Sequence, residues 1–189
     1  MIVCRAPSQV IALENTLNGT IFPQDEIIKI CNYAHSLGMK THLDGARIWH
    51  VAIETRKSIK QLCEPFDSIS VCFSKGLGQY IRSIVSHVVR ILSNLSMTSG
   101  APIGSCLVGT KEFITKARRF RKILGGGMRQ TGILAASAAF ALTHNFPQLP
   151  RVHALAKRLE VGLEDTGAII LSRAETCMVS VFLPGAAAI

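Results

Sequence analysis

Aromatic and acidic side chains are both scarce in this sequence. Phe, Trp and Tyr make up 6% of the residues, and 12 acidic residues stand against 21 Lys and Arg, which gives a formal net charge of +9. A charge of this size suits a nucleic-acid surface. However, the basic residues are not interleaved with the aromatic side chains that stack on bases, and no nucleic-acid-binding motif is present. We therefore expect no nucleic-acid partner, and interpret the excess charge as that of a partial chain whose acidic partner surfaces are absent.

Paired cysteines, long apolar runs and metal-ligand spacings are missing as well. The six cysteines are scattered without a CxxC pair, which excludes a small disulfide framework and predicts reduced thiols in a cytoplasmic protein. No apolar run is long enough to cross a bilayer, and Arg5 and Pro7 interrupt any secretory pattern, so no membrane association is expected. The six histidines show no spacing such as HExxH, so no metal site is expected.

Strand-like and helical stretches alternate along the first part of the chain. At 189 residues and 48% apolar content, the chain is long enough for one sizeable core. Strands are predicted at 9–15, 39–44, 66–74 and 101–109, and helices at 23–38 and 46–56. This order predicts an α/β fold with a mostly parallel sheet, built from β-α-β units and flanked by helices on both faces.

The second part of the chain is mainly helical. Residues 111–142 have a helical pattern that is broken at the glycines 125–127, and a further helix is predicted at 149–165. Residues 168–184 have the pattern of two strands, which would open a small C-terminal α+β subdomain. The predicted organisation is a partial large domain at 1–145 followed by a linking helix and an incomplete small domain at 146–189.

Two charged residues end successive predicted strands. Asp44 ends "THLD" and Lys75 ends "VCFSK", and ligands collect at the carboxyl ends of strands in open α/β sheets. Burial of a lysine costs solvation free energy and favours the free amine, which forms Schiff bases. A nearby carboxylate could pair with a pyridinium nitrogen, and together the two groups suit pyridoxal phosphate. The alternative is that both side chains are solvated loop residues.

Arg47 follows Asp44 by about one helical turn. Its planar guanidinium suits the carboxylate of an amino acid. Spacing alone equally favours a simple ion pair between Arg47 and Asp44. The sequence leaves both interpretations open.

Five segments carry a family resemblance. These segments, "LENTLNGTIFP", "HLDGARIWHVA", "SVCFSKGLG", "GAPIGSCLVG" and "RRFRKILGGGMRQTGILAA", together resemble the threonine aldolases. That family belongs to the aromatic amino acid β-eliminating lyases, which are pyridoxal-phosphate enzymes with the aspartate-aminotransferase-type fold (fold type I). The similarity extends from about Gln9 to Gly162, and its first segment has a fungal character.

The resemblance implies a role for each candidate site residue. Lys75 would carry the cofactor as a Schiff base, Asp44 would pair with its ring nitrogen, and Arg47 would bind the substrate carboxylate. Lys122 and Arg129, on either side of the glycine triplet, match basic residues near the cofactor phosphate, where a neighbouring subunit could supply them. A glycine-rich turn with flanking basic residues is also typical of a mobile exposed loop.

The resemblance also implies an activity. It implies a carbon–carbon lyase that cleaves L-threonine or L-allo-threonine to glycine and acetaldehyde, with pyridoxal 5'-phosphate as cofactor and a small amino acid as substrate. Complete relatives are expected to form homodimers or tetramers. One alternative keeps the cofactor but eliminates the β-substituent of another amino acid, and a second is an inactive fragment that serves only as an interaction module.

His42 matches a motif histidine of the family. Because His42 alternates with the apolar Leu43 along the predicted strand, we expect a hydrogen-bonded strand residue rather than a proton shuttle.

The sequence departs from the family pattern at three places. Residues 79–100 separate "SKGLG" from "APIGS", which adjoin in the family, and this insertion contains no Asp or Glu. Its apolar residues lie at helical intervals, which is typical of an amphipathic helix that binds a membrane or a partner. The alternative is a translated intron. We also expect truncation at both ends, with the upstream phosphate-binding segment and most of the small domain absent.

Overall fold

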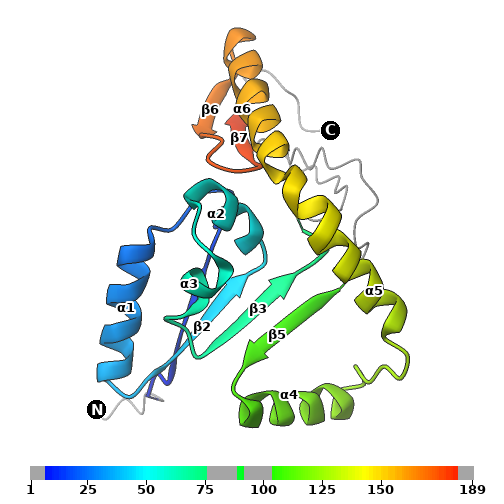
Figure 1. Cartoon of the computed structure of the whole chain (residues 1–189). Helices are drawn as coiled ribbons and strands as arrows, with labels where there is room; N and C mark the ends of the chain where they lie inside the picture. The colour runs from blue at the N-terminus through cyan, green and yellow to red at the C-terminus, as the bar shows by residue number, and fades with distance from the viewer. Residues whose placement is uncertain (1–6, 76–88, 92–103, 183–189) are drawn as a thin grey trace.

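A four-stranded sheet with the order β1-β2-β3-β5 forms the centre of the structure (Figure 1). The computed structural model describes residues 7–75, 89–91 and 104–182. The strands are β1 (Val10–Glu14), β2 (Lys40–Gly45), β3 (Ser68–Cys72) and β5 (Ser105–Gly109). β1, β2 and β3 are mutually parallel, whereas β5 is antiparallel to β3. The predicted α/β fold with a mostly parallel sheet is confirmed.

The reversed direction of β5 was not expected from the alternation of strands and helices. Cys72 lies opposite Ser105 and Ser68 lies opposite Gly109, so β5 begins at the edge of the sheet where β3 ends. The N–H of Phe73 donates to the carbonyl of Gly104 at 3.0 Å, which holds the two strand ends together. A strand that starts beside the end of its neighbour needs no helical crossover and pairs antiparallel.

Three helices cover one face of the sheet: α1 (Gln24–Ser36), α2 (Ile48–Thr55) and α3 (Ile59–Cys63). Side chains on that face, such as Leu43 and Ile69, are buried in the main core with Ile27 of α1 and Val51 of α2. The strand order advances from β1 to β3 without reversal, so right-handed crossovers place every connecting helix on the same side.

The opposite face of the sheet is less covered. It carries Ala12 and Asp44, both of which are exposed. The prediction that helices would cover both faces is therefore wrong for the described residues. The mostly polar sequence of β2, KTHLDG, already indicates this asymmetry, because a strand buried on both faces would be apolar throughout.

The local sequence explains where the first helices begin. Pro23 precedes α1, and Asp25 and Glu26 occupy its first turn, where the helix dipole favours acidic side chains. α3 has a capping box, in which the Ser58 hydroxyl accepts from the N–H of Gln61 and the Gln61 side chain accepts from the N–H of Ser58. This cap stabilises a helix of only five residues.

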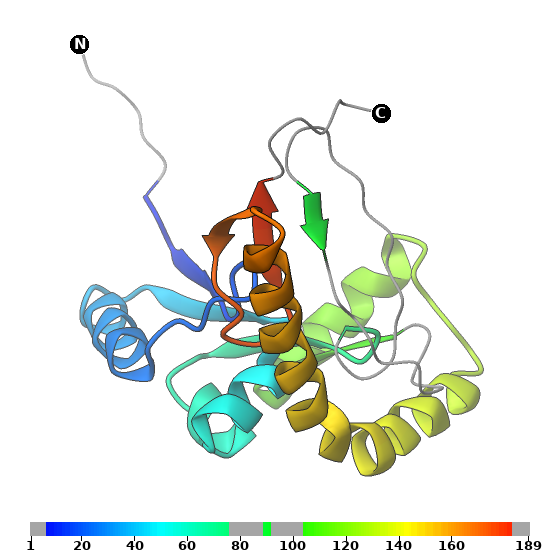
Figure 2. The ribbon, with the colours of Figure 1, turned by 90° about the horizontal axis from the view of Figure 1, so that it is seen from above.

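The helices after β5 lead from the central sheet to the C-terminal part of the chain (Figures 1 and 2). They are α4 (Lys111–Ile123), α5 (Gly132–Phe140), the π-helix η1 (Ala141–Asn145), the 3-10 helix η2 (Phe146–Gln148) and α6 (Leu149–Asp165). The break at the glycines 125–127 is confirmed, and α6 has the predicted bounds. None of these helices, nor any other in the described ranges, is long and apolar enough to cross a membrane.

A second, three-stranded antiparallel sheet packs against α6. Its order is β4-β7-β6, with bounds Val89–Ile91, Val179–Phe182 and Ile169–Ser172. β4 comes from the predicted insertion at 79–100, so residues 89–91 form a strand and not part of the expected amphipathic helix. The rest of that insertion lies outside the described residues.

Main-chain atoms hold the small sheet against the central one. The N–H of Ile21 donates to the Glu175 carboxylate at 2.7 Å, and the Thr176 hydroxyl donates to the carbonyl of Gly19 at 2.7 Å. Gly19 has a φ of +92°, and a Cβ there would lie 2.7 Å from the Cβ of Met178. Only glycine fits this approach, so the loop between β1 and α1 sits directly on the loop between β6 and β7.

Candidate functional site

The carboxyl ends of β2 and β3 bring Asp44 and Lys75 to the same edge of the sheet. Asp44 lies opposite Ser70 in the parallel register and is the last residue but one of β2. Lys75 stands three residues beyond Cys72, the last residue of β3. Adjacent parallel strands end at one edge, so the two charged groups come from neighbouring strand ends, where ligands bind in open α/β sheets.

The backbone after β2 orients the Asp44 carboxylate. Its Oδ1 accepts a hydrogen bond from the N–H of Ala46 at 3.0 Å, which fixes the side chain over the turn that follows the strand. Gly45 makes this turn possible, because a Cβ there would lie 3.0 Å from the carbonyl oxygen of Ser70. Within the described ranges no hydrogen bond reaches Oδ2, so an exposed carboxylate oxygen is available to accept from a ring N–H.

The strand end that carries Lys75 is held by aromatic side chains. The indole N–H of Trp49 donates to the carbonyl of Cys72 at 2.8 Å, and the ring stacks on Phe73 with 6.0 Å between centroids. Phe146 meets the other side of Trp49 edge-on at 6.2 Å. Lys75 is half-buried, and no carboxylate of the described residues lies within ion-pair distance of its amine. No local sequence pattern marks this support, because it depends on three separate segments.

Arg47 occupies the position directly before α2 and is half-buried. It forms no ion pair with Asp44, so the simple pairing that spacing allowed is absent. The positive charge of Arg47 lowers the pKa of the Cys177 thiol, although the larger effect of burial leaves that pKa raised.

Lys122 and Arg129 do not approach Asp44 within one chain. α4 starts where β5 ends, and that end lies beside Ser68, the first residue of β3. Figure 1 shows α4 running along this opposite edge of the sheet. Lys122 lies in the last turn of α4 and Arg129 follows that helix, and both residues are exposed to solvent. A second copy of the chain would have to supply these residues to the site.

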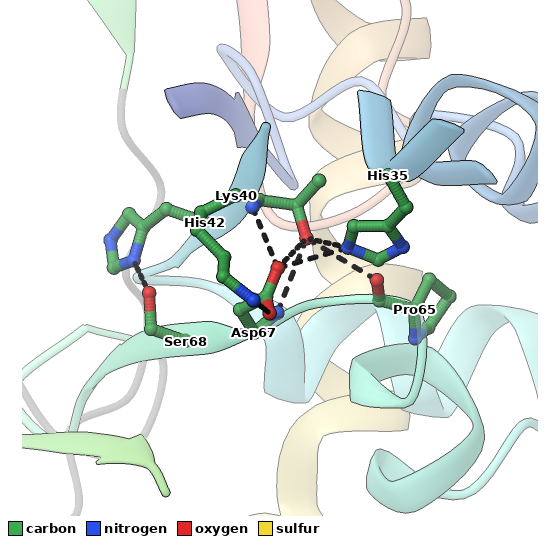
Figure 3. Close-up of polar contacts among 7 residues, drawn as sticks. His35, Lys40, His42, Pro65, Asp67 and Ser68 are labelled. Atoms are coloured by element: carbon green, nitrogen blue, oxygen red, sulfur yellow. Dashed lines mark hydrogen bonds and ion pairs between the residues drawn. The ribbon is translucent and has the colours of Figure 1, made fainter. Parts of the chain in front are cut away.

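A polar cluster at the amino ends of β2 and β3 surrounds Asp67 (Figure 3). The Asp67 carboxylate accepts from the Lys40 ammonium at 2.9 Å and from the N–H of Thr41 at 2.9 Å, and it contacts His35 Nε2 at 2.9 Å. Burial raises the pKa of Asp67, but these hydrogen bonds outweigh it and hold that pKa well below its usual range. The cluster joins α1, β2 and β3 at the edge away from Lys75, so its role is structural.

His42 also lies near the amino end of β3. Its Nδ1 lies 2.8 Å from the hydroxyl of Ser68, the residue directly opposite in β3 (Figure 3). The prediction that His42 is a hydrogen-bonded strand residue is confirmed. In the described part of the chain, no three His, Cys, Asp or Glu side chains gather closely enough to bind a metal ion.

Known proteins resemble this chain along most of its length. A family model described as "Beta-eliminating lyase" matches residues 3–185. The low-specificity L-threonine aldolase of Candida albicans is 40% identical over 174 residues, which are 92% of this chain and 41% of that protein. The low specificity L-threonine aldolase of Saccharomyces cerevisiae is 38% identical over 182 residues, which are 96% of this chain and 41% of that protein.

The likeness extends to a solved structure. The threonine aldolase of Leishmania major has a TM-score of 0.67 and 18% identity to this chain, and the match covers 89% of this chain and 44% of that one. At this identity the comparison bears on the fold alone, and it agrees with the fold type I architecture. The chain spans less than half the length of each of these relatives.

Proposed function

The chain belongs to the beta-eliminating lyase family, and from this premise we propose that it acts as a pyridoxal-phosphate-dependent carbon–carbon lyase. The proposed reaction cleaves L-threonine or L-allo-threonine to glycine and acetaldehyde. The observation that carries the proposal is that one sheet edge holds both an oriented carboxylate and an amine that has no ion-pair partner among the described residues. Two fungal relatives named L-threonine aldolases support this choice of substrate.

The residues at this edge fit pyridoxal phosphate. When bound, the cofactor supplies an electron sink for the charge that remains at Cα after the bond breaks. Lys75 would hold the cofactor covalently through its Nζ. Asp44, whose Oδ1 is fixed by Ala46, would keep the ring nitrogen protonated through its free oxygen. Lys122 and Arg129 of a second copy would neutralise the phosphate.

Arg47 would bind the carboxylate of the amino acid. A guanidinium can hold a carboxylate through two parallel hydrogen bonds, which fix the orientation of the carboxylate as well as its position. Arg47 forms no ion pair with any carboxylate of the described residues, so its donors are available to a substrate. Holding the carboxylate would fix the orientation of the amino acid's Cα–Cβ bond within the site.

Product analysis tests the proposed reaction. The purified chain is incubated with pyridoxal phosphate and L-threonine, and in parallel with L-allo-threonine. Glycine and acetaldehyde in equal amounts are expected. Ammonia with a 2-oxo acid would instead support the β-eliminating alternative, and the absence of any product would support the interaction module.

We also propose that a second copy of the chain covers the outer surface of α4 and α5. Neither helix has a buried residue, and Leu124 and Ile133 are 82% and 83% exposed. Contiguous apolar surface of this kind marks an interface. Since Lys122 and Arg129 lie on the same stretch, an interface here would deliver them to a partner's site. The apolar residues concerned are Phe120, Ile123, Leu124, Met128, Ile133 and Phe140.

Leu124→Glu is expected to weaken self-association. Burial of one leucine contributes about 2 kcal/mol, so its loss should raise the dissociation constant at least about tenfold. Light scattering after size exclusion measures the mass at several concentrations. Tyr33→Glu is the matched control, because Tyr33 is 67% exposed but lies on α1. A monomeric parent chain, or equal effects of both substitutions, would contradict the proposed interface.

A further inference from the structure

Two buried histidines connect α2 with α6. His50 is 0% exposed and His153 is 3% exposed, and the Nδ1 of His50 lies 2.8 Å from the Nε2 of His153. Their rings stack with 5.1 Å between centroids. The two residues are 103 positions apart in the sequence, so this contact joins the central sheet's helix layer to the helix that carries the small sheet.

A carboxylate and a lysine continue this line of contacts toward the surface. The Nδ1 of His153 lies 2.8 Å from Glu54 Oε2, and the Lys157 ammonium donates to Glu54 Oε1 at 2.7 Å. Burial raises the pKa of Glu54, but the hydrogen bonds from Lys157 and His153 outweigh it and lower that pKa. Glu54 is therefore ionised at neutral pH and can only accept hydrogen bonds.

The ionised Glu54 dictates the positions of the protons. Because Glu54 only accepts, His153 must carry its proton on Nδ1, which leaves its Nε2 with a lone pair. His50 must then donate from its own Nδ1, and its Nε2 keeps a buried lone pair that has no hydrogen-bond partner among the residues that the structure describes. Burial first, and the charges of His153 and Arg47 next, lower the pKa of His50 to about 3. Burial also lowers the pKa of His153, against the opposing effect of Glu54.

Arg47 lies where this line of contacts ends. The N–H of His50 donates to the carbonyl of Arg47 at 3.0 Å, so the two residues share the first turn of α2. The charge of Arg47 also contributes to the low pKa of His50, after burial and the effect of His153, so the guanidinium lies within electrostatic reach of the imidazole. A neutral His50 does not repel the guanidinium, and its hydrogen bond to His153 fixes the turn from which Arg47 extends.

We propose that His50 is a positioning residue, which acts through its Nδ1–H bond to His153 to hold Arg47 in place for a carboxylate ligand. The inference rests on the role proposed above for Arg47. It assigns a functional contribution to the small C-terminal unit, because α6 supplies the acceptor. The charged groups that act on the imidazole pair are Arg47, directly before α2, Glu54 from α2 and Lys157 from α6.

Two amide substitutions at position 50 test the proposal. His50→Asn places an N–H near the position of Nδ1 and can still donate to His153. His50→Gln places its amide near the position of Nε2 and cannot make the same bond. The two variants match in polarity, so a difference between them reports the hydrogen bond and not the mere presence of a polar group.

The reactivity of Arg47 toward phenylglyoxal gives a readout without cofactor or turnover. Peptide mass spectrometry compares the modification rate of Arg47 with that of Arg56, an exposed arginine at the other end of α2. Loss of one hydrogen bond should raise this ratio about fivefold in His50→Gln. The ratio in His50→Asn should match that of the parent chain. An unchanged ratio in His50→Gln, or equal changes in both variants, would overturn the proposal.

Steady-state kinetics give the second readout. The KM for L-threonine should rise about fivefold in His50→Gln with little change in kcat, and not in His50→Asn. In an Arg47→Ala background, His50→Gln should have no further effect on KM, whereas independent effects would contradict action through Arg47. If the parent chain does not cleave threonine, the proposed function fails and the phenylglyoxal ratio alone decides the positioning role. If His50→Gln does not fold, Glu54→Gln replaces it, since a neutral amide no longer dictates the tautomer of His153.

Discussion

Lys75→Ala is expected to abolish covalent capture of pyridoxal phosphate by this chain. Lys75 follows the end of β3, at the same edge of the sheet as Asp44, and its side chain is half-buried and without an ion-pair partner among the described residues. Alanine removes the nucleophile, and no compensating group is introduced. Borohydride reduction followed by peptide mass spectrometry should find the reduced adduct on Lys75 in the parent chain and no adduct at position 75 in the variant, which should also lose the imine absorbance.

A second lysine, Lys57, serves as the matched control for this loss. Lys57 is also half-buried and also lacks an ion-pair partner in the described ranges, but it precedes α3 and does not follow a strand. Lys57→Ala should leave both the absorbance and the adduct on Lys75 unchanged. Imine absorbance that persists in Lys75→Ala would refute the assignment of the Schiff-base lysine, and with it the proposed lyase function.

Asp67→Asn should lower the free energy of unfolding by about 2 kcal/mol at neutral pH. The substitution keeps the shape of the side chain and an oxygen that can accept from Thr41. It removes the negative charge that receives the Lys40 ammonium and the hydrogen bond with His35. Urea unfolding followed by circular dichroism measures the difference. Asp25→Asn, an exposed acidic residue in the first turn of α1, is the control and should have a much smaller effect.

The effect of Asp67→Asn should depend on pH. The folded-state pKa of Asp67 is depressed below its unfolded value, so its contribution is complete above the unfolded pKa and is lost as the pH falls toward the folded one. The stability difference between parent and variant should therefore be constant above about pH 5 and shrink progressively below that. A difference that stayed constant down to pH 2 would show that the charge of Asp67 does not stabilise the fold.

The periodicity of apolar residues along the sequence was sufficient to predict most of the secondary structure. Buried Leu43 and exposed Asp44 alternate in β2, and the bounds of α6 follow from its helical repeat. The direction of β5 could not be predicted, because a strand has the same alternation whether its neighbour is parallel or antiparallel. α3 is also too short, at five residues, to show a helical period.

The candidate site was predictable only in part. Asp44 and Lys75 are charged residues at the ends of apolar strands, so the sequence itself points to them. The His50–His153 contact joins residues 103 positions apart, and no local pattern marks it. Lys122 and Arg129 carry a basic pattern, but their distance from Asp44 follows from the reversed direction of β5, which the sequence does not reveal.

The contact at Gly19 has a consequence for how the chain tolerates sequence change. The carbonyl of Gly19 and the amide of Ile21 meet the Thr176 and Glu175 side chains, so peptide groups set the spacing of the two sheets on one side. Most replacements on the outer surface of either loop would leave that spacing as it is. A single methyl group at position 19 would collide with Met178 and separate the sheets, so this buried loop position is as restrictive as one in a core.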